Sequence, residues 1–294
     1  MIGSTSEISR DLIGTSGGKK TFSYGWRDVI LYALAVGVKE DELRYLYEKN
    51  LLVLPSFGAI PHLATFGAEP YTYLPDPIVT RILKPMPGFA AFHMAHEVIL
   101  HKPISPLGGT FDCEDKITDV FDRGSGKGVV VRSALTLTDK GGEKVSTSIY
   151  DFWFGGYTSL GSNPPPKSIA SIPDSPPDII TEDYISSTQH LLYRLCGDTN
   201  LPHVDPEFAA QMHTKPFMQG LCTWGFGVHH TCKAILPDQA DRVRKIGGQF
   251  RNIVFPGTKI AVHIWKQGET KAVFRVIDLE HDKIAIENGY VIWE

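Results

Sequence analysis

The chain has 294 residues, of which 42% are hydrophobic, enough to build a large core in one or two domains. Lys and Arg number 29 and Asp and Glu 33, which gives a formal charge of −4 without any long basic run. This composition argues against nucleic acid as a partner. No stretch approaches the roughly 18 consecutive apolar residues of a membrane-spanning helix, so no membrane partner is expected.

The cysteines indicate a reducing compartment. Cys113, Cys196, Cys222 and Cys232 form no CxxC pair, and a chain of this size does not depend on disulfides. The first residues lack a basic region followed by an apolar core, and the last three are not a Ser-Lys-Leu type signal. We therefore expect a cytoplasmic location, with the peroxisome as the alternative.

The first predicted helix carries an apolar stripe at Trp26, Val29, Ile30, Ala33 and Leu34, at offsets typical of a helix that faces a core. A glycine shortly after this stripe can end the helix. Runs of alternating polarity, separated by glycine turns, predict antiparallel strands at 91–102, 110–121, 128–138 and 145–154.

A segment rich in proline and serine, 161–180, predicts a linker between two domains, 1–160 and 181–294. In the second domain Thr181 is a candidate N-cap for a helix to about Cys196. Asp205 and Pro206 indicate the start of another helix, because Asp is a good N-cap and proline is tolerated at the first helical position. Further apolar patterns predict a helix at 219–236 and strands near 249–254, 259–266, 271–279 and 283–293.

The two halves share one organisation, in which helices come first and an antiparallel meander follows. This order predicts an α+β fold in which a curved sheet wraps a helix, and a duplicated module is consistent with it.

Asp198, Asn200 and His203 stand in a loop bounded by glycine and proline, between the end of one predicted helix and the start of the next. An Asp and a neutral His that converge on one water form a suitable acid/base pair for adding water across a double bond, and Asn200 could fix the water. The alternative is structural: Asp198 caps the turn and His203 bonds to backbone.

Gly220 stands at the start of a predicted helix, where free backbone N–H groups could stabilise a developing oxyanion. The alternative is that this glycine only allows tight packing against a sheet. Arg194, four residues before Asp198, could pair with that carboxylate or reach substrate phosphates. His93 alternates with Ala95 on a predicted strand, which favours a sheet face or a tunnel lining over catalysis.

His229 and His230, with neighbouring cysteines, suggest a metal site at first sight. On one continuous helix these side chains spread over different faces, so no metal is expected.

Taken together, these segments resemble the MaoC-like type-2 enoyl-CoA hydratases, including the hydratase part of peroxisomal multifunctional enzyme type 2. In the second half the resemblance is carried by Leu192-Tyr193-Arg194-Leu195-Cys196-Gly197-Asp198, Asn200, His203, Asp205-Pro206, Phe208-Ala209 and Gly220-Leu221-Cys222-Thr223. Elsewhere it is carried by Tyr32-Ala33-Leu34, Tyr47-Glu48, Leu54-Pro55-Ser56-Phe57-Gly58, Asp122-Arg123-Gly124-Ser125-Gly126 and Phe255-Pro256-Gly257. It covers nearly the whole chain.

The resemblance implies a double hot-dog fold with an acyl-tail cavity in the first domain and the catalytic loop in the second. It implies that Asp198 and His203 activate water, with help from Asn200, and that the N–H of Gly220 stabilises the thioester enolate. The substrate would be an acyl-CoA or related thioester, without metal or redox cofactor, and a homodimer is compatible with the family. The further substrate-binding positions would be Arg194, Tyr32, Glu48 and Leu221, although Glu48 also reads as an ordinary exposed glutamate.

Two positions depart from the family pattern. The family has Asn-Pro-Leu-His where this chain has Asn200-Leu201-Pro202-His203, and it has His where this chain has Gln219. The implied reaction is reversible hydration of trans-2-enoyl-CoA to (R)-3-hydroxyacyl-CoA. The alternatives are a dehydratase, lyase or isomerase acting on a specialised acyl or polyketide thioester, a thioesterase, and a non-catalytic acyl-CoA binding protein.

Overall fold

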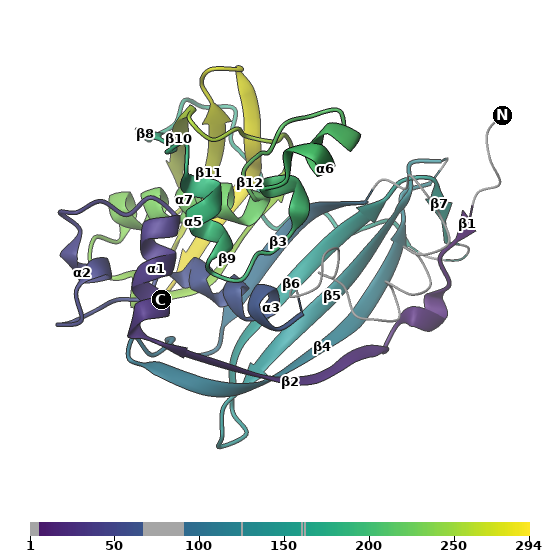
Figure 1. Cartoon of the computed structure of the whole chain (residues 1–294), viewed down its shortest axis with the longest axis horizontal. Helices are drawn as coiled ribbons and strands as arrows, with labels where there is room; N and C mark the ends of the chain where they lie inside the picture. The colour runs from purple at the N-terminus through teal and green to yellow at the C-terminus, as the bar shows by residue number, and fades with distance from the viewer. Residues whose placement is uncertain (1–5, 67–90, 125, 160, 162) are drawn as a thin grey trace.

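The computed structural model describes residues 6–66, 91–124, 126–159, 161 and 163–294. Within these residues ten strands form one continuous sheet in the order β2-β4-β5-β6-β3-β9-β12-β11-β10-β8, which runs through both halves of the chain (Figure 1). Every neighbouring pair in this sheet is antiparallel. β3 pairs with β6 on one side and β9 on the other, so it joins the two halves.

The N-terminal half contains the predicted helix and the four predicted strands, together with β2, which is not among the predicted strands. The strands of the large sheet are β2 (Ser16–Gly25), β3 (Ala91–Leu100), β4 (Gly108–Asp122), β5 (Val129–Thr138) and β6 (Lys144–Phe154). β1 (Ser6–Glu7) pairs in parallel with β7 (Tyr157–Thr158). The helical segments are η1 (Arg10–Leu12), α1 (Trp26–Ala35), α2 (Leu43–Leu46), η2 (Pro55–Ala59) and α3 (Ile60–Phe66).

The C-terminal half wraps its sheet around one long helix, α7 (Gly220–Ile235), which is buried along most of its length. The strands are β8 (Ile179–Tyr184), β9 (Val243–Phe250), β10 (Lys259–Lys266), β11 (Lys271–Asp278) and β12 (Lys283–Trp293). The shorter helices are α5 (Gln189–Arg194), η4 (Leu201–His203), α6 (Pro206–Gln211) and η5 (Ala240–Arg242). In the N-terminal half η2 and α3 pack against the sheet in the corresponding way, and the predicted α+β double hot-dog fold is confirmed.

The helix predicted to start at Thr181 is wrong in its first part, because residues 179–184 form the edge strand β8. Thr181 lies opposite Val262 of β10, and its hydroxyl is 2.8 Å from Nδ1 of His230. Ile179, Ile180 and Thr181 are β-branched and pack well on a pleated surface, so strand pairing wins over the N-cap. The helix itself, α5, begins only at Gln189.

The two halves are held together where the end of α1 meets α7. Gly37 has a φ of +87° and lies so close to the Phe226 ring that a Cβ there would be 2.1 Å from it. Gln189 donates from Nε2 to the carbonyl oxygens of Leu34 and Ala35, at 2.9 and 2.8 Å, and so satisfies the C-terminal end of α1. This docking fixes α5, and the loop after it, relative to α7.

Residues 163–178 of the predicted linker contain no helix or strand, and β8 begins at its end. The segment packs on the outer face of the C-terminal sheet, where Trp265 donates from Nε1 to the carbonyl of Ser175 at 2.8 Å and Ala170 is buried. The domain boundaries themselves stay a prediction. None of the helices that the structure describes is long and apolar enough to cross a membrane.

Candidate active site

A pocket of about 440 Å³ lies where the two halves of the sheet meet, a size typical of sites for small molecules. It draws its walls from β3, β6, η4, the start of α7 and the segment that follows β9. The residues that line it are Ala91, Phe92, His93, Phe152, Asp198, Asn200, Pro202, His203, Met212, Phe217, Met218, Gly220, Leu221, Thr223, Phe250, Arg251, Asn252, Ile253, Val254 and Ile286. Asp198, Asn200, His203, Gly220 and Leu221, all predicted from the sequence, therefore share one cavity.

His203 is 7% exposed and its ring is fixed by the backbone. Nδ1 lies 2.9 Å from the carbonyl oxygen of Phe217, which can only accept, so Nδ1 carries the proton and Nε2 keeps its lone pair. Burial lowers the pKa of His203 below its ordinary value of 6.5; the nearby carboxylate of Asp198 opposes this shift, and the charge of Arg194 adds to it. At neutral pH the imidazole is therefore neutral and ready to accept a proton.

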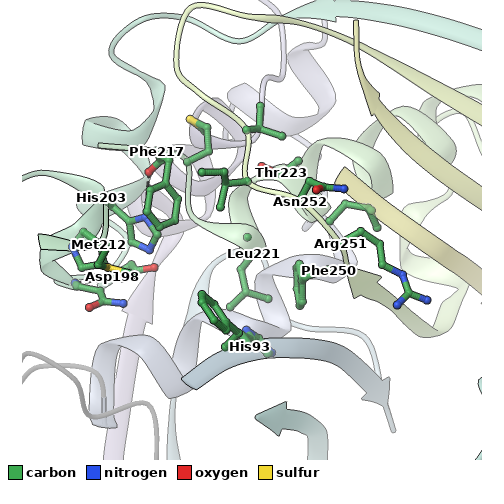
Figure 2. Close-up of a pocket in the computed structure, with 18 of the residues that line it drawn as sticks. His93, Asp198, His203, Met212, Phe217, Leu221, Thr223, Phe250, Arg251 and Asn252 are labelled. Atoms are coloured by element: carbon green, nitrogen blue, oxygen red, sulfur yellow. Dashed lines mark hydrogen bonds between the residues drawn. The ribbon is translucent and has the colours of Figure 1, made fainter. Parts of the chain in front are cut away.

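Asp198 is 3% exposed and stands beside His203 at one end of the pocket (Figure 2). Its Oδ1 accepts the N–H of Asn200 at 3.1 Å, an Asx-type contact that shapes the loop before η4. Pro202 occupies the middle of η4. The Leu-Pro order therefore leaves His203 in the pocket.

Gly220 is the first residue of α7, so its N–H points away from the helix and has no carbonyl partner within it. A Cβ at this position would be 3.0 Å from the Phe250 ring, which means that any larger residue presses on the pocket wall. The positive end of the α7 dipole also lies here. The site can thus stabilise negative charge on a carbonyl oxygen held above Gly220.

Several lining residues are not among the site residues predicted from the sequence, although the sequence favours a sheet face or a tunnel lining for His93. His93, Phe152 and Phe250 form an aromatic part of the wall, and Figure 2 shows His93 and Phe250 near Leu221. Arg251 and Asn252 are exposed where the cavity opens to solvent. Alternating polarity locates such strands, but only strand pairing shows that β3 and β9 are neighbours.

The remaining predicted binding positions lie outside the pocket lining. Tyr32 is 1% exposed and packs against Phe57 and Tyr193 in the core. Glu48 is exposed after α2, as in the simpler interpretation of that glutamate. Arg194 ends α5 near enough to His203 to influence its pKa, and its buried Nη1 has no hydrogen-bond partner among the described residues.

Gln219 precedes α7 as its N-cap and is 1% exposed. Its Nε2 donates to the carbonyl of His190 at 3.0 Å, whereas its Oε1 is buried with no partner in the part of the chain that the structure describes. This hydrogen bond therefore ties the start of α7 to α5.

His229 and His230 bind carboxylates. Nε2 of His229 lies 2.9 Å from Glu42, and Nε2 of His230 lies 3.2 Å from Asp183. Among the described residues, no group of three or more His, Cys, Asp or Glu side chains could hold a metal ion.

Two family models match this chain, one in each half. A family model described as "MFE-2 hydratase 2 N-terminal domain" matches residues 22–155, and one described as "MaoC like domain" matches residues 168–289. Enoyl-CoA hydratase ChsH3 of Mycobacterium tuberculosis is 31% identical over 91% of this chain and 92% of its own length. Peroxisomal multifunctional enzyme type 2 of Mus musculus is 30% identical over 95% of this chain, which spans only 38% of that longer protein.

Among solved structures, a MaoC-like dehydratase from Phytophthora capsici superposes with a TM-score of 0.83 and 25% identity, over 96% of both chains.

Proposed function

Because the chain belongs to the MaoC-like enoyl-CoA hydratase 2 family, we propose that it adds water reversibly to a trans-2-enoyl-CoA to give the (R)-3-hydroxyacyl-CoA. It is accordingly a hydro-lyase. The observation that carries the proposal is the neutral His203 with a fixed tautomer, held beside Asp198 in the same pocket as the start of α7.

In the proposed reaction a water molecule lies between Nε2 of His203 and the carboxylate of Asp198. Nε2 takes a proton from the water as its oxygen bonds to C3, and the electrons of the double bond move toward the thioester oxygen. Asp198 stabilises the imidazolium that forms, in line with its effect on the pKa of His203. The proton then goes to C2, so the atoms of one water are added.

The N–H of Gly220 is the proposed donor to the thioester oxygen, where negative charge develops in the transition state. Asn200 lines the pocket beside the Asp198–His203 pair and is proposed to hold the water or the new hydroxyl. No step calls for a metal or a redox cofactor.

Arg251 is proposed to contact a phosphate of coenzyme A. It is exposed at the mouth of the pocket, and its Nη2 donates to Gln249 at 2.6 Å, which leaves further N–H groups of the guanidinium for an anion.

The test uses the purified full chain with crotonyl-CoA and a longer trans-2-enoyl-CoA, followed by loss of enoyl-thioester absorbance. The expected result is fast loss with wild type and a rate at least about a hundredfold lower with His203→Ala, with the (R) product identified by chiral chromatography. Release of coenzyme A, detected with a thiol reagent, would indicate a thioesterase instead. Binding without turnover of either substrate would indicate a non-catalytic binding protein.

We also propose an assembly and a location in the cell. A homodimer is the proposed assembly, measured by light scattering coupled to size-exclusion chromatography. The cytoplasm is the proposed location, with the peroxisome as the alternative because relatives with peroxisomal names are among the matches; imaging of a tagged full-length protein decides between the two.

A further inference from the structure

Asn252 is a polar residue of the pocket lining to which the proposed reaction gives no role. It is exposed and directly follows Arg251, the proposed contact for a phosphate of coenzyme A. In Figure 2 the Asp198–His203 pair lies on one side of Leu221, and Asn252 and Arg251 lie on the other. Asn252 therefore stands on the side of the pocket where the carrier of the acyl group, rather than the reacting double bond, is expected.

The segment that contains Asn252 is fixed on two sides. The backbone N–H of Arg251 donates to the carbonyl of Ala285 at 2.9 Å, so the pairing of β9 with β12 continues past the end of β9. Two residues after Asn252, the carbonyl of Val254 accepts the N–H of Met218 at 2.8 Å, which ties the segment to the chain that leads into α7. These contacts fix Asn252 relative to the start of α7, where the thioester oxygen is proposed to bind.

The side-chain amide of Asn252 has one defined orientation. Its Nδ2 donates to the carbonyl of Ile284 at 2.8 Å, and a carbonyl can only accept, so turning the amide by half a rotation would lose this bond. Oδ1 is the other branch of the amide and has no hydrogen-bond partner among the residues that the structure describes. Asn252 thus offers an accessible acceptor that is oriented before a ligand arrives, which lowers the entropic cost of binding.

The ligand that suits this acceptor is a neutral chain with an N–H donor. The arm that joins the thioester sulfur of CoA to its phosphates contains two secondary amides, each with one N–H group. Gly220 is the proposed donor to the thioester oxygen and Arg251 the proposed contact for a phosphate, so the arm runs between them, past Asn252. A few well-placed polar groups of this kind are what orient a ligand in a largely apolar pocket.

We propose that Oδ1 of Asn252 accepts a hydrogen bond from an amide N–H of the pantetheine arm. This inference rests on the proposed function and deepens it, because it assigns a side chain that binds the carrier of the acyl group. Arg251 then recognises the nucleotide end of CoA, whereas Asn252 recognises any thioester that contains the amide, with or without a nucleotide.

The test compares trans-crotonyl-pantetheine with two analogues, in each of which one of the two amide N–H groups is replaced by an ester oxygen. For wild type, kcat/KM should fall about threefold to tenfold for one of the two analogues, the value of one neutral hydrogen bond. For Asn252→Ala, the amide and the ester substrates should have equal kcat/KM. Because each ratio is measured within one protein, a displacement of the segment by the mutation does not imitate this result.

Asn163→Ala is the matched control, because Asn163 is an exposed asparagine outside the pocket lining. It should keep the wild-type preference for the amide. Equal kcat/KM for all three substrates with wild type would overturn this inference and leave the hydratase proposal standing. A preference for the amide that persists in Asn252→Ala would overturn it too, since another group would then accept the N–H.

Recognition is also measured without turnover, by calorimetry with butyryl-pantetheine and its two ester analogues. If the enoyl substrates are not hydrated, weaker binding of one ester analogue by wild type, with no such difference in Asn252→Ala, still supports the inference. Equal binding of all three ligands by wild type overturns it.

Discussion

Nδ1 of His203 lies 2.9 Å from the carbonyl oxygen of Phe217, and this one contact decides which imidazole nitrogen faces the pocket. Phe217 comes shortly before α7, so the position of the helix and the tautomer of His203 are coupled. The bond leaves Nε2 unprotonated next to Asp198, as a base that removes a proton from water requires.

Replacing either member of this pair should abolish most turnover. We expect His203→Ala and Asp198→Asn each to lower kcat by about a hundredfold to ten-thousandfold, because each removes a group that acts on the transferred proton. Binding of a saturated acyl-CoA, measured by calorimetry, should change little. Wild-type rates in either variant would contradict the assignment.

The pH profile should report the environment of His203. Because its pKa lies below 6.5, kcat/KM should stay on its plateau at pH 6.5 and fall only at lower pH, as the ring becomes protonated. Arg194→Met removes a charge that lowers this pKa, so the acid limb should move to higher pH. Arg194→Lys keeps the charge and serves as the control; identical profiles for all three proteins would show that Arg194 has no such effect.

Gly220→Ala should lower kcat at least about tenfold. The added Cβ would stand 3.0 Å from the Phe250 ring and would displace either that ring or the thioester carbonyl from the N–H. Gly25→Ala is a suitable control, since Gly25 precedes α1 with open space around it. Steady-state kinetics, with thermal melting to confirm folding, provide the measurement, and an unaltered kcat for Gly220→Ala would rule out this donor.

Arg251→Ala should raise KM for a CoA thioester about tenfold, with little change in kcat, because a phosphate contact contributes equally to ground and transition states. The same variant should behave as wild type toward the pantetheine thioester of the same acyl group, which lacks the nucleotide. An equal rise in KM with both substrates would place the effect elsewhere in the pocket.

The contacts between Glu42 and α7, a hydrogen bond from His229 and an ion pair with Lys233, should make stability depend on acid. Glu42 is nearly buried, which by itself would raise its pKa, but hydrogen bonds and charge from His229, with smaller contributions from Lys39 and Lys233, lower it to about 2. This stabilisation is fully present above pH 4.5, the ordinary pKa of the group, and is lost as pH falls toward 2. Glu42→Gln should lower the free energy of unfolding at pH 7 by about 2–4 kcal/mol.

Urea unfolding of wild type and Glu42→Gln at several pH values between 2 and 7 measures this difference. It should shrink as the pH falls through this range. A difference that is independent of pH would show that the loss comes from packing rather than from the charge.

Local patterns in the sequence determined much of this protein. The stripe of α1, the alternation in β3 to β6 and the proline at the start of α6 depend on neighbouring residues, and the structure contains each of these elements. Asp198, Asn200 and His203 are close in sequence, within one short loop, so their convergence also follows from local constraints. Gly220 was a candidate from its position at the start of a predicted helix, and the resemblance added the expected role of its N–H at the thioester oxygen.

Only the tertiary structure decided which distant segments complete the pocket. Residues 179–184 became a strand because β10 offered a pairing edge, which outweighs a favourable N-cap. Tyr32 lies outside the pocket because α1 packs closely on Gly225 of α7, whereas Glu48 is exposed after α2. The place of His93 beside Phe152 and Phe250 depends on the pairing of β3 with β9 and with β6, whose register is irregular next to His93. Such properties arise from long-range pairing, which a local pattern of residues does not specify.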